Sequence, residues 1–174
     1  LQRPDLLENK KPRSINMVQI GKALNDKKLN PPIKHLCVWN SDIANCTPDS
    51  SNVRDGLKRK DLFTVVHDTF WTDSCMYADV VLPADTQLEH TDLHAPYGHY
   101  YFSLTQQAIK PLGESKSNQD LFRELAKQMG YKEKCFKESD ESMIKNMIDP
   151  KYNPLFKGVT YEKLKKNGWV KGDV

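Results

Sequence analysis

The sequence predicts an α/β fold, in the form of a three-layer α/β/α domain with a mostly parallel sheet. Short β-prone runs alternate with amphipathic helical segments, and the connections between the runs are too long for hairpins. Because parallel strands need a crossover that is usually helical, this alternation indicates a sheet with helices on both faces. The composition, 38% hydrophobic and 28% charged over 174 residues, is typical of a globular domain.

The first strand and its flanking helices are expected in the first third of the chain. Ser14 can cap a helix that runs to about Asn25, after which two prolines break the chain. Residues 33–39 (IKHLCVW) are a short, mostly apolar run typical of a buried strand. A polar turn follows at 40–42, and residues 49–59 predict a short second helix.

Two further strands are expected in the next segment. Residues 62–66 (LFTVV) are rich in β-branched side chains and predict a strand that ends on His67 and Asp68. A short helix is expected at 72–78. The third strand, 79–82, stops at a proline, which cannot donate to a sheet.

The remaining elements follow more irregular sequence. Residues 97–109 suggest an irregular strand or an extended flap. Ser117 opens the clearest helix, since apolar residues recur on one face and Gly130 stands where a C-terminal cap belongs. Two more amphipathic helices are expected at about 138–148 and 160–166.

The predicted organisation is one α/β domain with two peripheral segments. It comprises a poorly ordered lead-in over 1–13, the α/β domain over 14–135 and a C-terminal helical extension over 136–174. The first residue is Leu1, and the start lacks the apolar core of a signal peptide, so we expect a piece of a longer protein. No apolar run reaches the roughly 20 residues that a membrane-spanning helix needs.

Charge and cysteine content exclude several function classes. The net charge is +3 and basic residues are interspersed with acidic ones, so no nucleic-acid partner is expected. The four cysteines form no C-x-x-C pair, which argues against a zinc ribbon or an iron–sulfur cluster within this segment. Scattered single thiols suit a reducing compartment, and we expect the cytoplasm.

Polar residues follow two neighbouring strands of the predicted sheet. Asn40, Ser41 and Asp42 follow the first strand, and His67 and Asp68 end the second. The carboxyl ends of parallel strands meet at one edge, where ligands of α/β folds bind. An acid at the end of the second strand commonly accepts hydrogen bonds from ribose hydroxyls, and a carboxylate offers only acceptors. The alternative interpretation is that Asp68 only starts a turn.

Other ligand motifs are incomplete. Residues 40–44 contain no glycine, which argues against a self-sufficient NAD site. Asn118 stands in the first turn of the capped helix, where free N–H groups could meet a ligand, although on this signal alone simple helix-start chemistry is the favoured explanation. Glu89, His90 and His94 could bind zinc if they were helical, but the flanking proline and glycine disfavour a helix there. We therefore predict no metal site, and keep a small metal-dependent hydrolase as an alternative.

Three segments, in order, resemble motifs of one enzyme superfamily. They are VWNSDIA at 38–44, VVHDTFWTDSCMYADVVLPADTQLEHTD at 65–92 and PLGESKSNQDLFRELAKQMGY at 111–131. Over roughly residues 14–170 the chain resembles the molybdopterin oxidoreductases of the dimethyl sulfoxide reductase superfamily.

The resemblance implies a Rossmann-like domain that holds the guanosine half of one molybdopterin guanine dinucleotide. Asp42 takes the place of an Asn usual in the family, and Asn118 stands where other members carry Asp. The cofactor-binding residues that the resemblance implies are Asn40, Ser41, Asp42, His67, Asp68, His90 and Asn118.

The resemblance also implies the activity of the intact protein, a molybdenum-dependent oxidoreductase whose cofactor carries the redox step. An iron–sulfur cluster, if there is one, would lie outside this segment. The partners would be the remaining domains of the parent enzyme, and the isolated chain would be inactive. A stand-alone α/β binding or interaction module without cofactor is the second hypothesis.

Overall fold

The computed structural model describes residues 13–173, which form two compact units that divide between Ala84 and Asp85. The expected lead-in over 1–13 lies outside the described residues, apart from Arg13. The expected domain boundary after residue 135 is a different division of the chain and stays a prediction. Within residues 13–173, no helix is long and apolar enough to cross a membrane.

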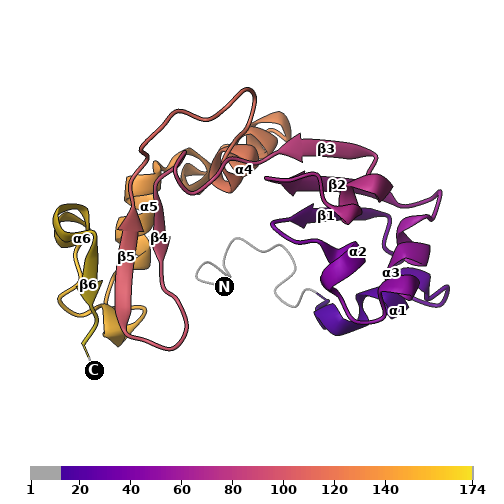
Figure 1. Ribbon diagram of the computed structural model, residues 1–174, viewed down its shortest axis with the longest axis horizontal. Helices are drawn as coiled ribbons and strands as arrows, with labels where there is room; N and C mark the ends of the chain where they lie inside the picture. The colour runs from indigo at the N-terminus through magenta and orange to yellow at the C-terminus, as the bar shows by residue number, and fades with distance from the viewer. Residues whose placement is uncertain (1–12, 174) are drawn as a thin grey trace. The chain divides into compact units, whose positions relative to one another are not determined.

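The first unit is built on a parallel three-stranded sheet, which confirms the predicted α/β class (Figure 1). Strands β1 (His35–Trp39), β2 (Phe63–Asp68) and β3 (Val80–Pro83) lie in the order β1-β2-β3. Their register pairs Val38 with Val66, and Val66 with Val81. The three predicted strands are thus correct to within about two residues at each end.

Five helical segments of residues 13–84 accompany these strands: two precede β1 and three connect the strands. They are η2 (Met17–Gln19), α1 (Ile20–Asn25), α2 (Ile43–Cys46), α3 (Ser50–Leu57) and η3 (Asp73–Tyr77). Four were expected as parts of longer helices or as short ones. The four-residue α2 was not expected, since the predicted turn covered only residues 40–42.

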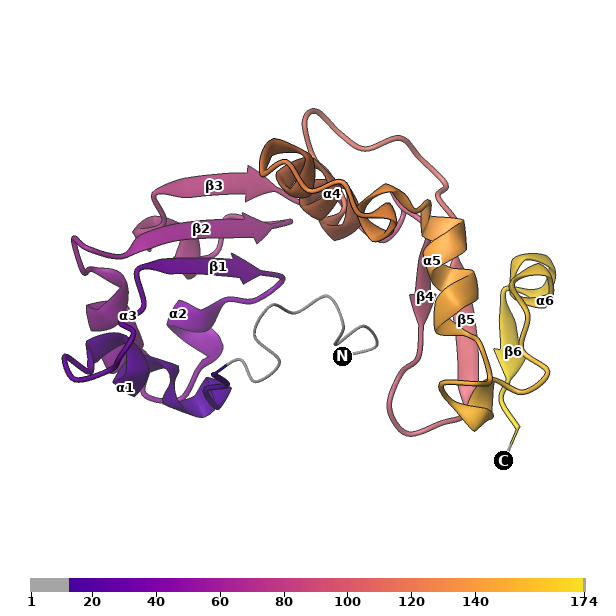
Figure 2. The ribbon, with the colours of Figure 1, turned by 180° about the vertical axis from the view of Figure 1, so that it is seen from behind.

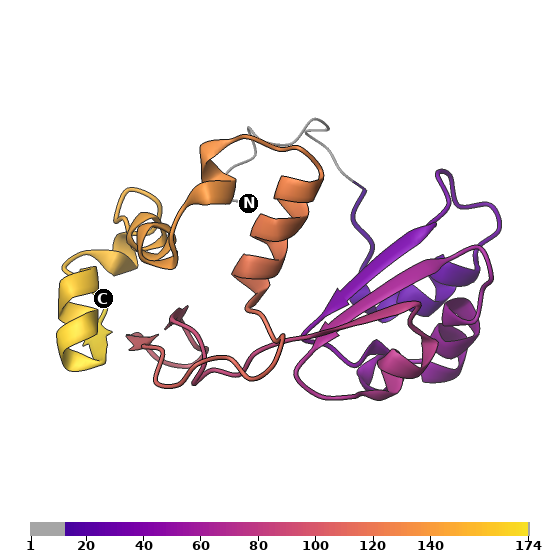
Figure 3. The same cartoon turned by 90° about the horizontal axis from the view of Figure 1, so that it is seen from above.

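The helices α1, α2 and α3 pack on one face of the sheet (Figure 3). On this face Leu36 contacts the helical core, and Val38 and Val66 pack with Cys75 of η3. Helices α1 and α3 approach closely: a Cβ on Gly56 would lie 2.5 Å from the Cβ of Leu24. The missing side chain of this glycine is therefore what allows the two helices to pack.

The opposite face of the sheet carries large exposed side chains. Trp39, Phe63 and Val80 are each between 39% and 49% exposed, and the rings of His35 and Phe63 stack with centroids 5.9 Å apart. The expected second helical layer is not contributed by the α-helices of residues 13–84, since all three of them pack on the other face.

The second unit contains an antiparallel sheet, visible from behind in Figure 2. Strands β4 (Asp92–His94), β5 (Tyr101–Thr105) and β6 (Trp169–Lys171) lie in the order β4-β5-β6. Only β5 was expected. Strand β6 follows Gly168, whose φ of 77° ends the preceding helix and turns the chain back towards β5.

The helices of the second unit include the three that were predicted. They are α4 (Asn118–Gln128), α5 (Asp140–Met147) and α6 (Tyr161–Asn167), with short turns at η4 (Lys134–Lys137) and η5 (Pro154–Phe156). The core between α5, α6 and the antiparallel sheet is formed by Phe102, Leu104, Ile144, Ile148, Phe156, Val159, Tyr161 and Leu164.

Candidate functional site

The carboxyl ends of β1 and β2 bring five predicted site residues to one edge of the parallel sheet. Trp39 pairs with His67 in the register, and the N–H of Asn40 donates to the carbonyl of His67 at 3.2 Å. Asn40, Ser41 and Asp42 therefore begin beside the last two residues of β2. This is the convergence that parallel topology predicts.

Asn40 turns the chain away from the sheet at this edge. Its φ is 51°, in the left-handed region, and its side chain is exposed. Asn is one of the few residue types that adopt this conformation readily, which explains an Asn directly after the strand.

Asp42 has structural partners at the same edge. Its Oδ1 accepts hydrogen bonds from the backbone N–H of Ser74 at 3.0 Å and from the Ser74 hydroxyl at 2.7 Å. The Ser74 Oγ in turn accepts from the N–H of Ala44 at 3.0 Å. Ser74 is 1% exposed, so this network ties the loop after β1 to the start of η3 in a buried place.

Asp68 ends β2 in a half-buried position. Its Oδ1 accepts from the N–H of Phe70 at 3.2 Å, and its carbonyl accepts from the N–H of Ala84 at 3.0 Å. The first bond is the turn contact that the sequence left open as an alternative. A carboxylate has about four lone-pair sites, so one bond to a backbone amide is compatible with further donors.

His67 is fully buried, at 0% exposure. Its side chain is therefore a poor candidate for direct contact with a ligand at the edge. Its backbone carbonyl, which accepts from Asn40, is what connects the two strand ends.

Exposed aromatic side chains follow Asp68, and the sequence analysis did not single them out. Phe70, Trp71 and Met76 are each at least 70% exposed. The indole N–H of Trp71 donates to the Met76 sulfur at 3.4 Å, which orients the ring. Two adjacent aromatic residues at the second and third positions after a strand-end acid are the sequence signal for this feature.

The second unit holds the other two predicted residues. The Nδ1 of His90 lies 2.9 Å from the Oδ1 of Asp85, whose side chain is only 4% exposed. Burial raises the pKa of the Asp85 carboxyl, and the neighbouring His90 opposes that shift. Asn118 is the first residue of α4, and Ser117 caps this helix by accepting from the N–H of Asp120 at 3.1 Å.

Glu89 is a buried residue whose role the sequence analysis missed. Its Oε2 accepts from the Thr86 N–H at 2.7 Å and from the Thr86 hydroxyl at 2.9 Å, while Oε1 accepts from the Leu112 N–H at 2.7 Å. The carboxylate thus ties together two loops 23 residues apart. The bonds from Thr86 are the main cause of a lowered Glu89 pKa.

The zinc alternative is not supported by this geometry. His94 lies on β4 and its Nε2 is 2.8 Å from the hydroxyl of Thr105, while His90 contacts Asp85. Within residues 13–173, no three His, Cys, Asp or Glu side chains are placed to hold one metal ion.

Glu89 also predicts a pH dependence of stability. A carboxyl whose pKa is lowered on folding stabilises the fold above its ordinary value of about 4.3, and this contribution is lost as the pH falls through the lowered pKa. We expect Glu89→Gln to melt a few degrees lower at pH 7, and this deficit to shrink below about pH 4. Melting curves from pH 7 to 3 check this; a deficit that stays constant with pH would contradict it.

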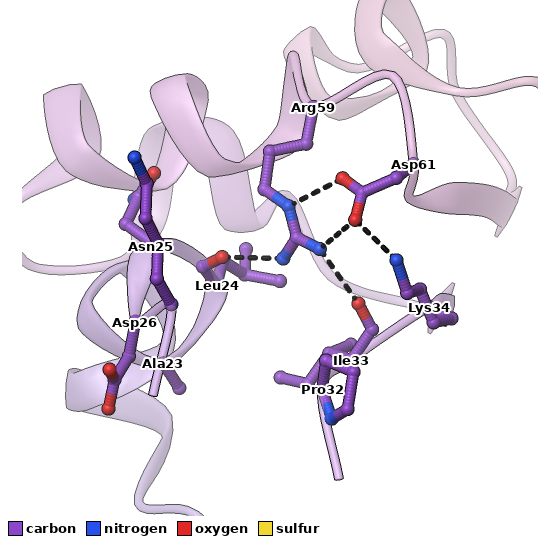
Figure 4. Close-up of a pocket in the computed structure, with 10 residues that line it drawn as sticks. Ala23, Leu24, Asn25, Asp26, Pro32, Ile33, Lys34, Arg59 and Asp61 are labelled. Atoms are coloured by element: carbon purple, nitrogen blue, oxygen red, sulfur yellow. Dashed lines mark hydrogen bonds and ion pairs between the residues drawn. The ribbon is translucent and has the colours of Figure 1, made fainter. Parts of the chain in front are cut away.

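A pocket of about 460 Å³ lies at the other end of the parallel sheet (Figure 4). Figure 4 shows the guanidinium of Arg59 donating to the carbonyls of Leu24 and Ile33 and to the carboxylate of Asp61. The Nζ of Lys34 donates to the same carboxylate at 2.6 Å.

These bonds explain the lowered pKa of Asp61, for which the hydrogen bond from Arg59 is the first cause. Lys34 precedes β1 and Asp61 precedes β2, so the pocket lies at the amino ends of the strands. Its charged groups cross-link helix α1 to the sheet rather than form a second ligand site.

An α/β unit with a parallel sheet and polar strand ends defines the structural class. The chain belongs to the molybdopterin oxidoreductases, because the model of the family "Molybdopterin oxidoreductase" matches residues 12–128. It is 44% identical over 171 residues to the probable oxidoreductase YoaE of Bacillus subtilis (strain 168), covering 98% of this chain and 25% of that protein.

Other relatives agree with this assignment. The F420-dependent formate dehydrogenase subunit alpha of Methanocaldococcus jannaschii is 34% identical over 136 residues, which cover 78% of this chain and 20% of that protein. The solved structure of acetylene hydratase from Pelobacter acetylenicus matches with a TM-score of 0.70 at 26% identity, covering 91% of this chain and 21% of that one. The chain thus spans about a quarter or less of these relatives.

Proposed function

We propose that this chain binds the guanosine end of a molybdopterin guanine dinucleotide, as one domain of a larger molybdenum-dependent oxidoreductase. The observation that carries this proposal is the position of Asp68 at the carboxyl end of β2, beside the loop that begins at Asn40. Membership of the molybdopterin oxidoreductases supports a molybdenum–pterin cofactor for the parent protein.

The chemistry of the residues at this edge fits a guanosine. The base presents N–H donors and the ribose presents hydroxyls, and both are matched by carboxylate, amide and hydroxyl oxygens. Asn40 and Ser41 are exposed and Asp68 is half-buried, so these three are the proposed direct contacts. Asp42 and His67 would then shape the edge through the bonds described above.

His90 and Asn118 of the second unit are proposed to contact the dinucleotide as well. His90 is partly exposed and held by Asp85, and Asn118 lies in the first turn of α4. When bound, the cofactor would supply two-electron chemistry at molybdenum, while residues of this chain would bind and orient it.

The activity of the parent protein is proposed to be an oxidoreductase reaction whose substrate is chosen elsewhere in the protein. Relatives that share this segment include a formate dehydrogenase subunit and the trimethylamine-N-oxide reductase of Escherichia coli (strain K12). Since these names indicate different substrates, this segment is not expected to set specificity. The other domains, any iron–sulfur cluster and a cytoplasmic location belong to the same proposal, as does the inactivity of the isolated chain.

A nucleotide-binding titration tests the proposal on the chain itself. GDP-mannose is a suitable probe because it carries guanosine on a diphosphate that is esterified at both ends, as in the dinucleotide. We expect it to bind at least about tenfold more tightly than ADP-glucose or UDP-glucose, because a site with groups matched to guanine leaves them unpaired with other bases. Calorimetry or ligand-detected NMR would measure this.

Two results would contradict the proposal. Equal affinity for all three nucleotide sugars would mean that no group of the chain recognises the guanine base. The absence of any binding would favour the second hypothesis, an α/β binding or interaction module without cofactor.

A further inference from the structure

The side chains of Asp85 and His90 are in direct contact in the second unit. The carboxylate of Asp85 lies 2.9 Å from the Nδ1 of the ring, and its side chain is 4% exposed, against 21% for His90. The backbone N–H of Asp85 donates to the carbonyl of Lys116 at 3.1 Å. The backbone of Asp85 is thus tied to the loop before α4 and its carboxylate is buried against the ring, while the ring retains access to solvent.

We propose that Asp85 is a positioning residue that orients His90 towards the diphosphate of the bound dinucleotide. Asp85 accepts a hydrogen bond from Nδ1–H, which leaves Nε2 as the ring atom presented outward. In the protonated ring Nε2–H donates to a phosphate oxygen. This inference rests on the proposed function for its ligand, but the orientation of the ring is a property of the chain alone.

A carboxylate behind a histidine commonly sets which ring nitrogen is protonated and where the other one points. A buried carboxylate also stabilises the positive charge of a protonated ring, because opposite charges at hydrogen-bond distance interact strongly away from water. An imidazolium held in this way suits an anionic phosphate better than it suits a neutral base.

The other charged groups near this pair do not replace Asp85. Glu89 interacts with His90 electrostatically, but its two oxygens accept from Thr86 and Leu112. The charge of Asp120 contributes to the raised pKa of Asp85, but the Asp120 carboxylate forms an ion pair with Arg123 at 2.8 Å. Asp85 is thus the acidic group in direct contact with the ring.

The competing explanation is a purely structural clasp between residues 85 and 90. Loss of a purely structural contact would lower the stability of the fold, but it would not selectively weaken the binding of ligands that carry phosphate. The test therefore needs the ring itself and a comparison of ligands with and without phosphate.

The first measurement is the protonation of the two ring nitrogens by ¹⁵N NMR in the ligand-free chain, at a pH where the ring is neutral. We expect the proton on Nδ1 of His90 in the unaltered chain, and loss of that preference in Asp85→Ala. Asp85→Asn should keep it, because an amide oxygen also accepts. His94 is the internal control and should not change, since its Nε2 contacts Thr105. If Asp85→Ala leaves the proton of His90 on Nδ1, the inference is wrong.

The second measurement compares GDP-mannose with guanosine, which lacks phosphate. We expect His90→Gln and Asp85→Ala to weaken GDP-mannose binding about three- to tenfold, the range of one hydrogen bond, and to leave guanosine binding unchanged. His94→Gln should change neither.

The outcomes separate this inference from the proposed function. If His90→Gln weakens neither ligand, or both equally, the phosphate contact is wrong, while the proposed function stands as long as Asp68→Ala impairs binding. If the unaltered chain binds neither ligand, the proposed function fails and the phosphate contact fails with it.

Discussion

Asp68→Ala is expected to weaken the binding of guanosine nucleotides about ten- to a hundredfold and to leave the fold nearly unchanged. Removing one partner of a charged hydrogen bond costs about 1.5–3 kcal/mol, which corresponds to roughly that range in affinity. The proposed partners of the Asp68 carboxylate are ligand donors, so this cost falls on binding. Surface substitutions usually change stability by less than about 0.5 kcal/mol, or about 1–2 °C for a chain of this size.

Asp68→Asn is the matched control for this variant. The amide oxygen can keep the bond to the N–H of Phe70, so the turn after β2 is preserved while the charge is lost. In titrations with GDP-mannose, the affinity of Asp68→Asn should lie between that of the unaltered chain and that of Asp68→Ala. In the parent protein, the Ala variant should also retain less cofactor.

A reversed pattern would show that Asp68 is a turn residue. In that case Asp68→Ala would lower the melting temperature by many degrees and the nucleotide affinity would stay normal. The hydrogen bond from the N–H of Phe70 to the Asp68 carboxylate would then account for the role of this side chain.

The elements that sequence predicted best are those whose signals are local. The parallel strands are short runs of β-branched and apolar residues with polar ends, and α4 carries its own cap at Ser117. Strand β6 has three residues and pairs with β5, with Tyr101 opposite Lys171. Such a pairing depends on where two distant segments meet, and no pattern within either segment encodes it.

The candidate site shows the same division. Parallel topology alone is enough to predict that the strand ends at Asn40 and Asp68 converge. The hydrogen-bond partners of individual carboxylates are not predictable in this way, because they lie far away in the sequence. Asp42 bonds to Ser74, 32 residues away, and Glu89 bonds to Leu112. The burial of His67 likewise depends on tertiary packing.

Asp42 and Asp68 are two acids at one sheet edge with different expected roles. Asp42→Ala should lower the free energy of unfolding by about 1.5–3 kcal/mol, because it removes the acceptor of two bonds from Ser74, one of them from a buried backbone N–H. Urea denaturation followed by tryptophan fluorescence would measure this. Ser74→Ala should be destabilising as well, since it removes the acceptor for the N–H of Ala44.

Asp42→Asn distinguishes an acceptor from a charge. Both bonds from Ser74 end on one oxygen, Oδ1, and an Asn side chain carries such an oxygen. We therefore expect Asp42→Asn to stay within about 1 kcal/mol of the unaltered chain. The double variant Asp42→Ala/Ser74→Ala should cost less than the two single changes added, because both break the same network. If Asn proves as harmful as Ala, the negative charge itself is required at this position, and Asp42 acts through more than its bonds to Ser74.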